Sequence, residues 1–266
     1  MHRRELLRRL LTFVPTSGFV VGFFGGRSFA SARPAALPAA AATPAPVLPP
    51  QEAAAETLRE VSYGMGIDLD KCIGCGRCMI ACKTENDVPD QPFYVRTWVE
   101  RYAIGSDGEV TVRTIDVDET ARPPIVEDDV LRTFFVPKLC NQCEKPPCVQ
   151  VCPVGATFST EDGVVLVDDQ RCVGCRYCIQ ACPYGARFFN PYSRTADKCT
   201  FCYHRLDKGL LPACVEVCPT QARVFGDLNG ISPITRLKRT NKIHTLKPEL
   251  NTEPKVLYAN LDGAVR

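Results

Sequence analysis

The stretch RCVGCRYCIQACPYGARFF, residues 171–189, places four cysteines within eleven positions and follows the last of them with a proline. Three thiols that lie two residues apart can surround one inorganic iron–sulfur cluster on a tight loop. The fourth lies on the helical turn that follows, where it points away from that loop and can reach a second cluster. The stretch therefore predicts a fold that is built around iron–sulfur clusters.

The 16 cysteines of the 266-residue chain fall into four such sets, and no cysteine is left over. The sets are Cys72, Cys75, Cys78 and Cys82; Cys140, Cys143, Cys148 and Cys152; Cys172, Cys175, Cys178 and Cys182; and Cys199, Cys202, Cys214 and Cys218. The third set has the spacing of bacterial ferredoxins that hold two clusters. Since a cubane cluster takes four thiolates, the four sets predict four [4Fe-4S] clusters.

Other residues of the cysteine loops agree with cluster binding. Gly74 and Gly174 lie between ligands, where the backbone approaches inorganic sulfur and a positive φ is expected. Backbone amides on such loops can donate hydrogen bonds to the sulfurs. A proline that ends the helical turn follows the last cysteine of three sets, at Pro153, Pro183 and Pro219. Lys83 stands at the matching place in the first set, which departs from this pattern.

Two other uses of the cysteines are disfavoured by their spacing. An even cysteine count in an exported protein is typical of a disulfide scaffold, but cysteines two residues apart cannot join distant parts of a chain. Paired C-x2-C motifs also bind zinc, although a zinc site does not explain a C-x2-C-x2-C-x3-C-P run. A C-x-x-C-H motif for haem attachment does not occur in the sequence.

The N-terminal region has the layout of an export signal. Residues 1–32 begin with basic residues, continue with a weakly apolar run and end in small residues. The pair Arg3-Arg4 and the residues after it resemble a twin-arginine signal, and an uncleaved membrane anchor is the alternative. Removing this segment changes the net charge of the chain from +2 to −2. A remaining chain with this charge has no electrostatic attraction to nucleic acid. Residues 33–61, rich in Ala and Pro, predict an extended linker.

Internal repeats predict an α+β fold made of two ferredoxin-like modules with two clusters each. YGMGIDLDKCIGCGRCMIAC and GVVLVDDQRCVGCRYCIQAC share a strand, an acidic turn, a cysteine loop and a short helix. CPVGATF, CPYGARF and CPTQARVF share C-P-x-x-A before a strand. The predicted organisation is an outer module at 62–83 and 196–230, a β-rich insertion at 84–133, an inner module at 134–195 nested inside the outer one, and an irregular docking tail at 231–266.

The insertion holds no cysteine. Its run PFYVRTWVERYAI, residues 92–104, predicts a strand, and GSDGE after it predicts a hairpin turn. Trp98 in this run is expected to be a core or interface aromatic rather than an electron relay. Few apolar residues surround the many ligands. We therefore expect cluster binding to stabilise the core and the chain without clusters to be largely unfolded.

The stretches LCNQCEKPPCVQVCPVGATFSTEDGVVLVDDQRCVGCRYCIQACPYGARFFNP and ADKCTFCYHRLDKGLLPACVEVCPTQARVFGD resemble the four-cluster electron-transfer subunits (beta subunits) of the dimethyl sulfoxide reductase superfamily. The likeness is greatest to the iron–sulfur subunits of tetrathionate, thiosulfate and polysulfide reductases and of cytochrome-linked nitrite reduction. It extends over residues 62–228, and the tail is less specifically similar.

The resemblance implies a crossed ligation of four [4Fe-4S] clusters. The implied sets are Cys72, Cys75, Cys78 and Cys218 for cluster 1; Cys82, Cys199, Cys202 and Cys214 for cluster 2; Cys140, Cys143, Cys148 and Cys182 for cluster 3; and Cys152, Cys172, Cys175 and Cys178 for cluster 4. All sixteen positions hold cysteine, so nothing indicates the three-iron cluster that some relatives carry.

The resemblance also implies a role as an electron relay in an exported, membrane-associated oxidoreductase. In the family, a large molybdopterin subunit performs catalysis and an integral membrane subunit exchanges electrons with quinol. The sequence itself contains no phosphate loop, dinucleotide fingerprint or nucleophile–base arrangement, so we expect no catalytic site and no small-molecule substrate. A free periplasmic polyferredoxin, or a partner of a multihaem nitrite reductase, is the alternative function.

Four basic residues near the last set, Lys198, His204, Arg205 and Lys208, have two interpretations. Their charge can raise the potential of a cluster. They can equally form a solvated or docking face, and the sequence favours this second interpretation.

Overall fold

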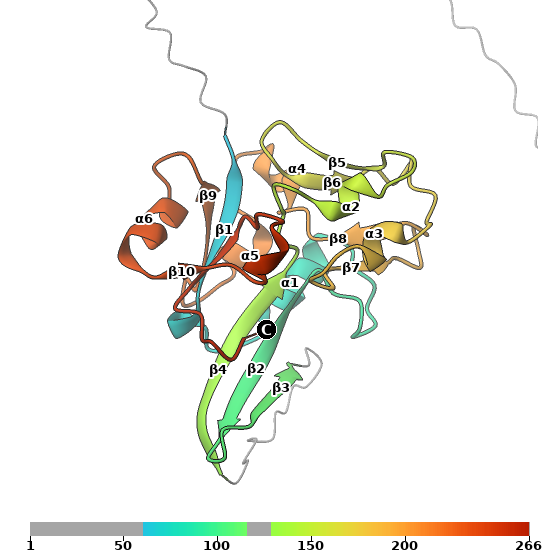
Figure 1. Ribbon diagram of the computed structural model, residues 1–266. Coiled ribbons are helices and arrows are strands. Elements are labelled where there is room, and N and C mark those ends of the chain that lie inside the picture. Colours follow the sequence, from blue (N-terminus) through green and yellow to red (C-terminus); the bar gives the residue numbers. More distant parts are fainter. Residues whose placement is uncertain (1–60, 116–128, 266) are drawn as a thin grey trace, which may run out of the picture. The chain divides into compact units, whose positions relative to one another are not determined.

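The computed structural model describes residues 61–115 and 129–265 (Figure 1). The predicted signal at 1–32 and all but the last residue of the predicted linker at 33–61 lie outside the described residues. The same is true of residues 116–128 of the insertion. Within the described ranges, no helix has the length and apolar character needed to cross a membrane.

The central sheet joins segments from both ends of the described residues (Figure 1). Strand β1 (Tyr63–Asp68) lies between β9 (Arg223–Asp227), which is antiparallel to it, and β11 (Val256–Ala259), which is parallel to it. The short strand β10 (Ile243–His244) pairs with the outer edge of β11. Every residue of β1 after Tyr63 is buried, so this strand forms the centre of the core.

Helix α6 (Pro233–Thr240) packs on this sheet. A capping box between Ser232 and Thr235 begins the helix, and Ile234 and Leu237 face inward. A side chain at Gly66 of β1 would place its Cβ only 2.6 Å from Leu237, so glycine there permits close packing of the helix. The sequence predicts an irregular tail at 231–266, and the structure differs because this segment contributes a helix and two strands.

The insertion forms an antiparallel sheet with strand order β3-β2-β4, which projects as a long ribbon in Figure 1. Strands β2 (Thr97–Gly105) and β3 (Val110–Thr114) are joined by the predicted turn, and β4 (Val130–Leu139) pairs along the other edge of β2. The predicted strand is confirmed, although it begins at Thr97 rather than at residue 92. Trp98 packs against two hydrophobic clusters, in agreement with its predicted role in packing.

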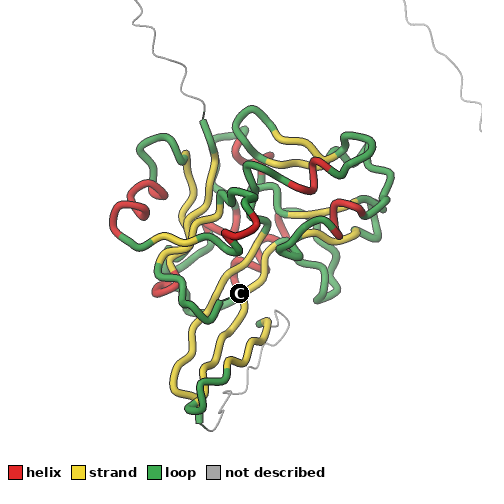
Figure 2. Tube along the Cα trace, viewed as in Figure 1, coloured by secondary structure: helices red, strands yellow, loops and turns green. Residues whose placement is uncertain are grey.

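Small hairpins and single-turn helices surround the loops that carry most cysteines of the second and third sets (Figure 2). The elements are α2 (Pro147–Gln150), β5 (Thr157–Ser159), β6 (Val165–Val167), α3 (Tyr177–Gln180), β7 (Arg187–Phe189) and β8 (Ala196–Lys198). β5 pairs with β6, β7 pairs with β8, and α2 packs near α3. These contacts are made inside the stretch that separates β1 from β9.

The prolines explain why most of the helices after the cysteine loops are short. The helices α2, α3 and α5 (Ala213–Glu216) each span four residues and end before a cysteine and a proline. Helix α4 (Tyr203–Leu206) is equally short and follows Cys202, which has a left-handed φ of 54°. Helix α1 (Arg77–Glu85) has Lys83 in place of proline and continues for nine residues, where it packs against α5.

Lys83 also fixes the loop that follows α1. Its Nζ donates hydrogen bonds to the carbonyl oxygens of Pro89, Asp90 and Gln91 at 3.1, 3.0 and 2.9 Å. The departure from proline in the first set therefore has a structural consequence, because a charged side chain caps three backbone carbonyls of the insertion.

We expect Lys83→Met to loosen this loop without removing a cluster. Hydrogen bonds with a charged donor stabilise by about 1–2 kcal/mol when partly exposed, which corresponds to about 5- to 30-fold in an opening equilibrium. Hydrogen exchange of the backbone amides of Val88 and Tyr94 should accelerate by that factor. Lys208→Met, at an exposed position, serves as the control. Unchanged exchange in Lys83→Met would contradict the capping role.

Candidate metal centres

Two cavities in the structure are each lined by four cysteines that come from two different sequence motifs. One is lined by Cys82 together with Cys199, Cys202 and Cys214. The other is lined by Cys140, Cys143, Cys148 and Cys182. The structure thus brings together all the residues that are predicted for clusters 2 and 3.

The remaining two sets are less enclosed. Burial raises the pKa of the Cys72 thiol, the backbone N–H of Gly74 opposes this, and the charges of Cys78 and Cys218 raise the pKa further. These three predicted ligands of cluster 1 are therefore neighbours. For cluster 4, Cys172 packs against a small buried cluster of side chains that includes Cys178.

The exposed cysteines occupy equivalent places in the two loops. Cys75 and Cys175 are the second cysteines of the first and third sets, and both are exposed to solvent. Gly74 and Gly174 have the expected positive φ, at 65° and 69°. A Cβ at Gly74 would lie 2.4 Å from the ring of Phe135, so protein packing also requires glycine there.

The cavities keep their thiols away from water. Burial, followed by the charges of neighbouring thiols, raises the pKa of Cys82 well above its usual value. Burial also raises the pKa of Cys199 to about 12 and that of Cys214 to about 11. Burial raises the pKa of Cys143 to about 12 as well. Because metal ligation requires thiolates, a bound cationic group must compensate these buried charges.

The last cysteines of two sets have a different environment. Burial tends to raise the pKa of Cys152, but backbone N–H groups, that of Thr157 first among them, hold it below its usual value. The environment of Cys218 is similar. Hydrogen-bond donors of the backbone and side chains that follow it in the sequence outweigh the effect of burial and lower its pKa. The predicted amide donors to sulfur are therefore present, and the amide of Phe201 adds one to Cys199 Sγ at 3.4 Å.

The cavities fit [4Fe-4S] clusters by their donor set and by one buried polar atom. Four cysteine thiolates are the usual ligands of such a cluster. Arg187 Nε is buried beside the cysteines without a hydrogen-bond partner in the structure, and an inorganic sulfide is an acceptor that would satisfy it. Among the described residues, no three side chains of His, Cys, Asp or Glu are arranged to hold a single metal ion.

Three buried cations lie among the cysteines. Arg187, Lys198 and Arg223 have exposed fractions of 5%, 1% and 2%. Lys198 Nζ donates to the carbonyl oxygens of Val165 and of Cys199, the latter at 2.8 Å. The sequence favours a solvated face for Lys198, and its complete burial between two cysteine sets corrects that interpretation.

The other basic residues near the last set behave differently. His204 Nε2 lies 2.8 Å from Glu85 Oε1, and Arg205 Nη1 donates to Glu85 Oε2 at 2.8 Å. Arg205 also pairs with Glu216. These contacts tie α4 to α1 and α5, whereas Lys208 is exposed to solvent, as the sequence favoured.

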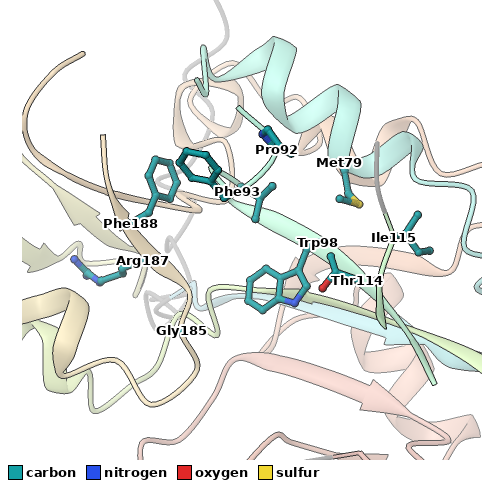
Figure 3. Close-up of a pocket in the computed structure, with 10 residues that line it drawn as sticks. Met79, Pro92, Phe93, Trp98, Thr114, Ile115, Gly185, Arg187 and Phe188 are labelled. Carbon is teal, nitrogen blue, oxygen red and sulfur yellow. The ribbon is translucent and has the colours of Figure 1, made fainter. Parts of the chain in front are cut away.

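Sequence reasoning missed a further feature, an open pocket beside the inner hairpins. Figure 3 shows Trp98, Phe93 and Phe188 around it, with Arg187 at one side. Phe93 is largely exposed, and Trp98 Nε1 donates to Glu100 Oε1 at 2.8 Å. The residues come from α1, the insertion and β7, so no single sequence motif could indicate the pocket.

Comparisons with known proteins identify two iron–sulfur domains in this chain. Two family models, each described as a 4Fe-4S dicluster domain, match residues 71–156 and 131–228. The B subunit of tetrathionate reductase from Salmonella typhimurium is 44% identical over 207 residues, which cover 76% of this chain and 74% of the relative. The B polypeptide of polysulfide reductase from Wolinella succinogenes is 40% identical over 206 residues, which cover 76% of this chain and 97% of the relative.

Protein NrfC of Escherichia coli is 43% identical over 199 residues, which cover 74% of this chain and 79% of the relative. Three such relatives, together with two dicluster models that span most of the described residues, show the family. The chain thus contains domains for [4Fe-4S] clusters, and the protein belongs to the iron–sulfur electron-transfer subunits, the B subunits, of the dimethyl sulfoxide reductase superfamily.

Proposed function

We propose that this protein relays single electrons through four [4Fe-4S] clusters between a quinone-reactive membrane subunit and a molybdopterin-dependent catalytic subunit. The observation that carries the proposal is the pair of cavities with four cysteines each, made from crossed motifs. The clusters supply the redox chemistry when bound. The polypeptide holds them, shields clusters 2 and 3 from water and sets the potentials of all four.

The proposed ligands are the four crossed sets that the family resemblance implies. In support, Cys82 lines one cavity together with cysteines that lie more than a hundred residues later in the sequence. Cys182 lines the other cavity together with three cysteines of the second set. Two nested modules follow from this arrangement. They are supported by the pairing of β1 with β9 around the separate hairpins β5–β6 and β7–β8.

We further infer that the protein works on the outer face of the cytoplasmic membrane after export by the twin-arginine route. The support is the sequence of residues 1–32. A route for folded proteins allows the clusters to be inserted before export. The cysteine thiols would then already be bound to iron when the protein reaches the oxidising compartment.

A fixed place in a complex explains the insertion more fully than a free polyferredoxin does. The sheet β3-β2-β4 contains no cysteine, and Val110, Val112 and Leu131 on it are exposed. Apolar side chains on a projecting sheet are typical of surfaces that contact another protein. The relatives are also named as parts of reductases.

Purification of the tagged protein from membranes of the native host tests the proposal. We expect a large molybdenum-containing subunit and an integral membrane subunit to elute with it. Chemical analysis should also find about sixteen iron atoms and as many acid-labile sulfides per chain, as four cubane clusters require. A protein that elutes alone with full iron would support the polyferredoxin, and a protein without labile sulfide would refute both functions.

A further inference from the structure

Two of the buried cations occupy the same position in two sequence repeats. Arg187 ends CPYGAR and Arg223 ends CPTQAR, so each lies five residues after the last cysteine of its set. Each is also the first residue of a strand, β7 or β9. The repeats thus deliver an arginine side chain to equivalent places in the two proposed modules.

Arg187 lies between the cysteines of two proposed clusters. Its Nη2 donates to Cys148 Sγ at 2.9 Å, and its Nη1 donates to Thr157 Oγ1 at 3.3 Å. Its charge also acts on Cys140 and Cys178. Cys140 and Cys148 belong to proposed cluster 3, whereas Cys178 belongs to proposed cluster 4.

Arg223 has the corresponding place in the other module. Its side chain is buried and hydrogen-bonds the thiol of Cys214, which belongs to proposed cluster 2. Its charge also acts on Cys78 and Cys72, which belong to proposed cluster 1. Its Nη2 donates to Thr97 Oγ1 at 2.8 Å, and its Nη1 lies 3.8 Å from Met65 Sδ. These two acceptors are neutral, so they do not compensate the charge.

The chemistry of the guanidinium group suits this position. Arginine stays protonated under all ordinary conditions, and its fork can serve two acceptors at once. Reduction adds one electron, and so one negative charge, to a cluster without any proton or bond change. A fixed cation in a buried, low-dielectric position favours the reduced cluster and therefore raises its potential.

We propose that Arg187 and Arg223 are equivalent positioning residues, each of which holds a permanent positive charge between the two clusters of one module and raises the reduction potentials of both. Because the charge favours the reduced form of each cluster, one module can accept two electrons more readily. This inference rests on the proposed function, since it takes the four clusters as given.

The test is a potentiometric titration of the purified holoprotein with dithionite as reductant, followed by electron paramagnetic resonance. Arg187→Gln should lower the potentials of the two clusters of the inner module and leave those of the outer module unchanged. Arg223→Gln should do the reverse. We expect each shift to equal at least a tenfold change in the reduction equilibrium, which is about 59 mV for one electron.

The sequence offers matched controls. Arg171 precedes Cys172 and Lys71 precedes Cys72, with 71% and 54% of their side chains exposed. Arg171→Gln and Lys71→Gln remove the same charge close to the same clusters but from solvent, which screens it. The cluster potentials of these two control variants should change by less than a third of the change that the Arg187→Gln and Arg223→Gln variants show.

Substitution of each arginine by lysine distinguishes the effect of the positive charge from the effect of the side-chain shape. Arg187→Lys and Arg223→Lys keep the charge and should retain most of the original potentials. Iron and sulfide are measured in every variant, and too few clusters in the unmodified protein would refute the proposed function rather than this inference. Three outcomes would overturn the inference: fully loaded Gln variants with unchanged potentials, loaded Lys variants with shifts as large as those expected for Gln, or loss of iron from the Gln and Lys variants alike.

Discussion

Cys143→Ala is expected to remove one cluster, about four iron atoms, and to abolish the electron paramagnetic resonance signal of that cluster alone. Cys143 lines its cavity with Cys182, which belongs to a different motif. Cys182→Ala should therefore abolish the same signal. Cys152→Ala, in the same motif as Cys143, should abolish a different one, because its proposed partners lie in the third set.

This set of three variants tests the crossed ligation directly. Each variant is the control for the other two, since all remove one thiol from the same module. The measurement is a reductive titration with iron analysis of each protein. If Cys143→Ala and Cys152→Ala lost the same signal while Cys182→Ala lost another, each motif would hold its own cluster and the proposed ligand sets would be wrong. Electron transfer to the catalytic subunit should fall at least a hundredfold in all three, since a relay fails when one centre is missing.

Removal of iron is expected to unfold most of residues 134–195. Apart from the end of β4, which belongs to the three-stranded sheet, this stretch contains single-turn helices, the hairpin β5–β6 and strand β7, and none of these is stable in isolation. The small hydrophobic cluster that it forms contains two cysteines and Val165, with Ala196 of β8 and a few partly buried neighbours. The cluster-binding energy therefore has to supply much of its folding energy.

The experiment is anaerobic treatment with an oxidant and a chelator, followed by far-ultraviolet circular dichroism and limited proteolysis. We expect loss of strand signal and rapid cleavage within 134–195, with recovery after iron and sulfide are returned. The same treatment without chelator is the control. A treated protein that keeps its protease resistance would show that the polypeptide packing alone maintains the fold.

The cysteine loops could be predicted in detail because metal chemistry constrains them locally. Gly174 needs its positive φ, and a proline after Cys182 limits α3 to one turn. Each of these features depends on a few adjacent residues. The hairpin after β2 was predictable for the same reason, since its turn chemistry is local.

Features that depend on distant packing were not predicted. VLYA, residues 256–259, is too short to identify as a strand, and it becomes one only because β1 offers an edge. The full burial of Lys198 depends on hairpins from two motifs that meet around it. The two arginines left a visible signal in the repeated C-P-x-x-A-R pattern, but its meaning required the positions of the neighbouring thiols.

The place of β1 in the central sheet has a consequence for biosynthesis. β1 is translated before the hairpins β5–β6 and β7–β8, yet both neighbours of this strand, β9 and β11, are translated after them. Folding of this sheet therefore has to wait until β9 and β11 have been synthesised, whereas the hairpins between residues 157 and 198 can form as they emerge. A message truncated before codon 256 would produce a polypeptide whose first strand lacks one neighbour, and cells could recognise and degrade it as incomplete.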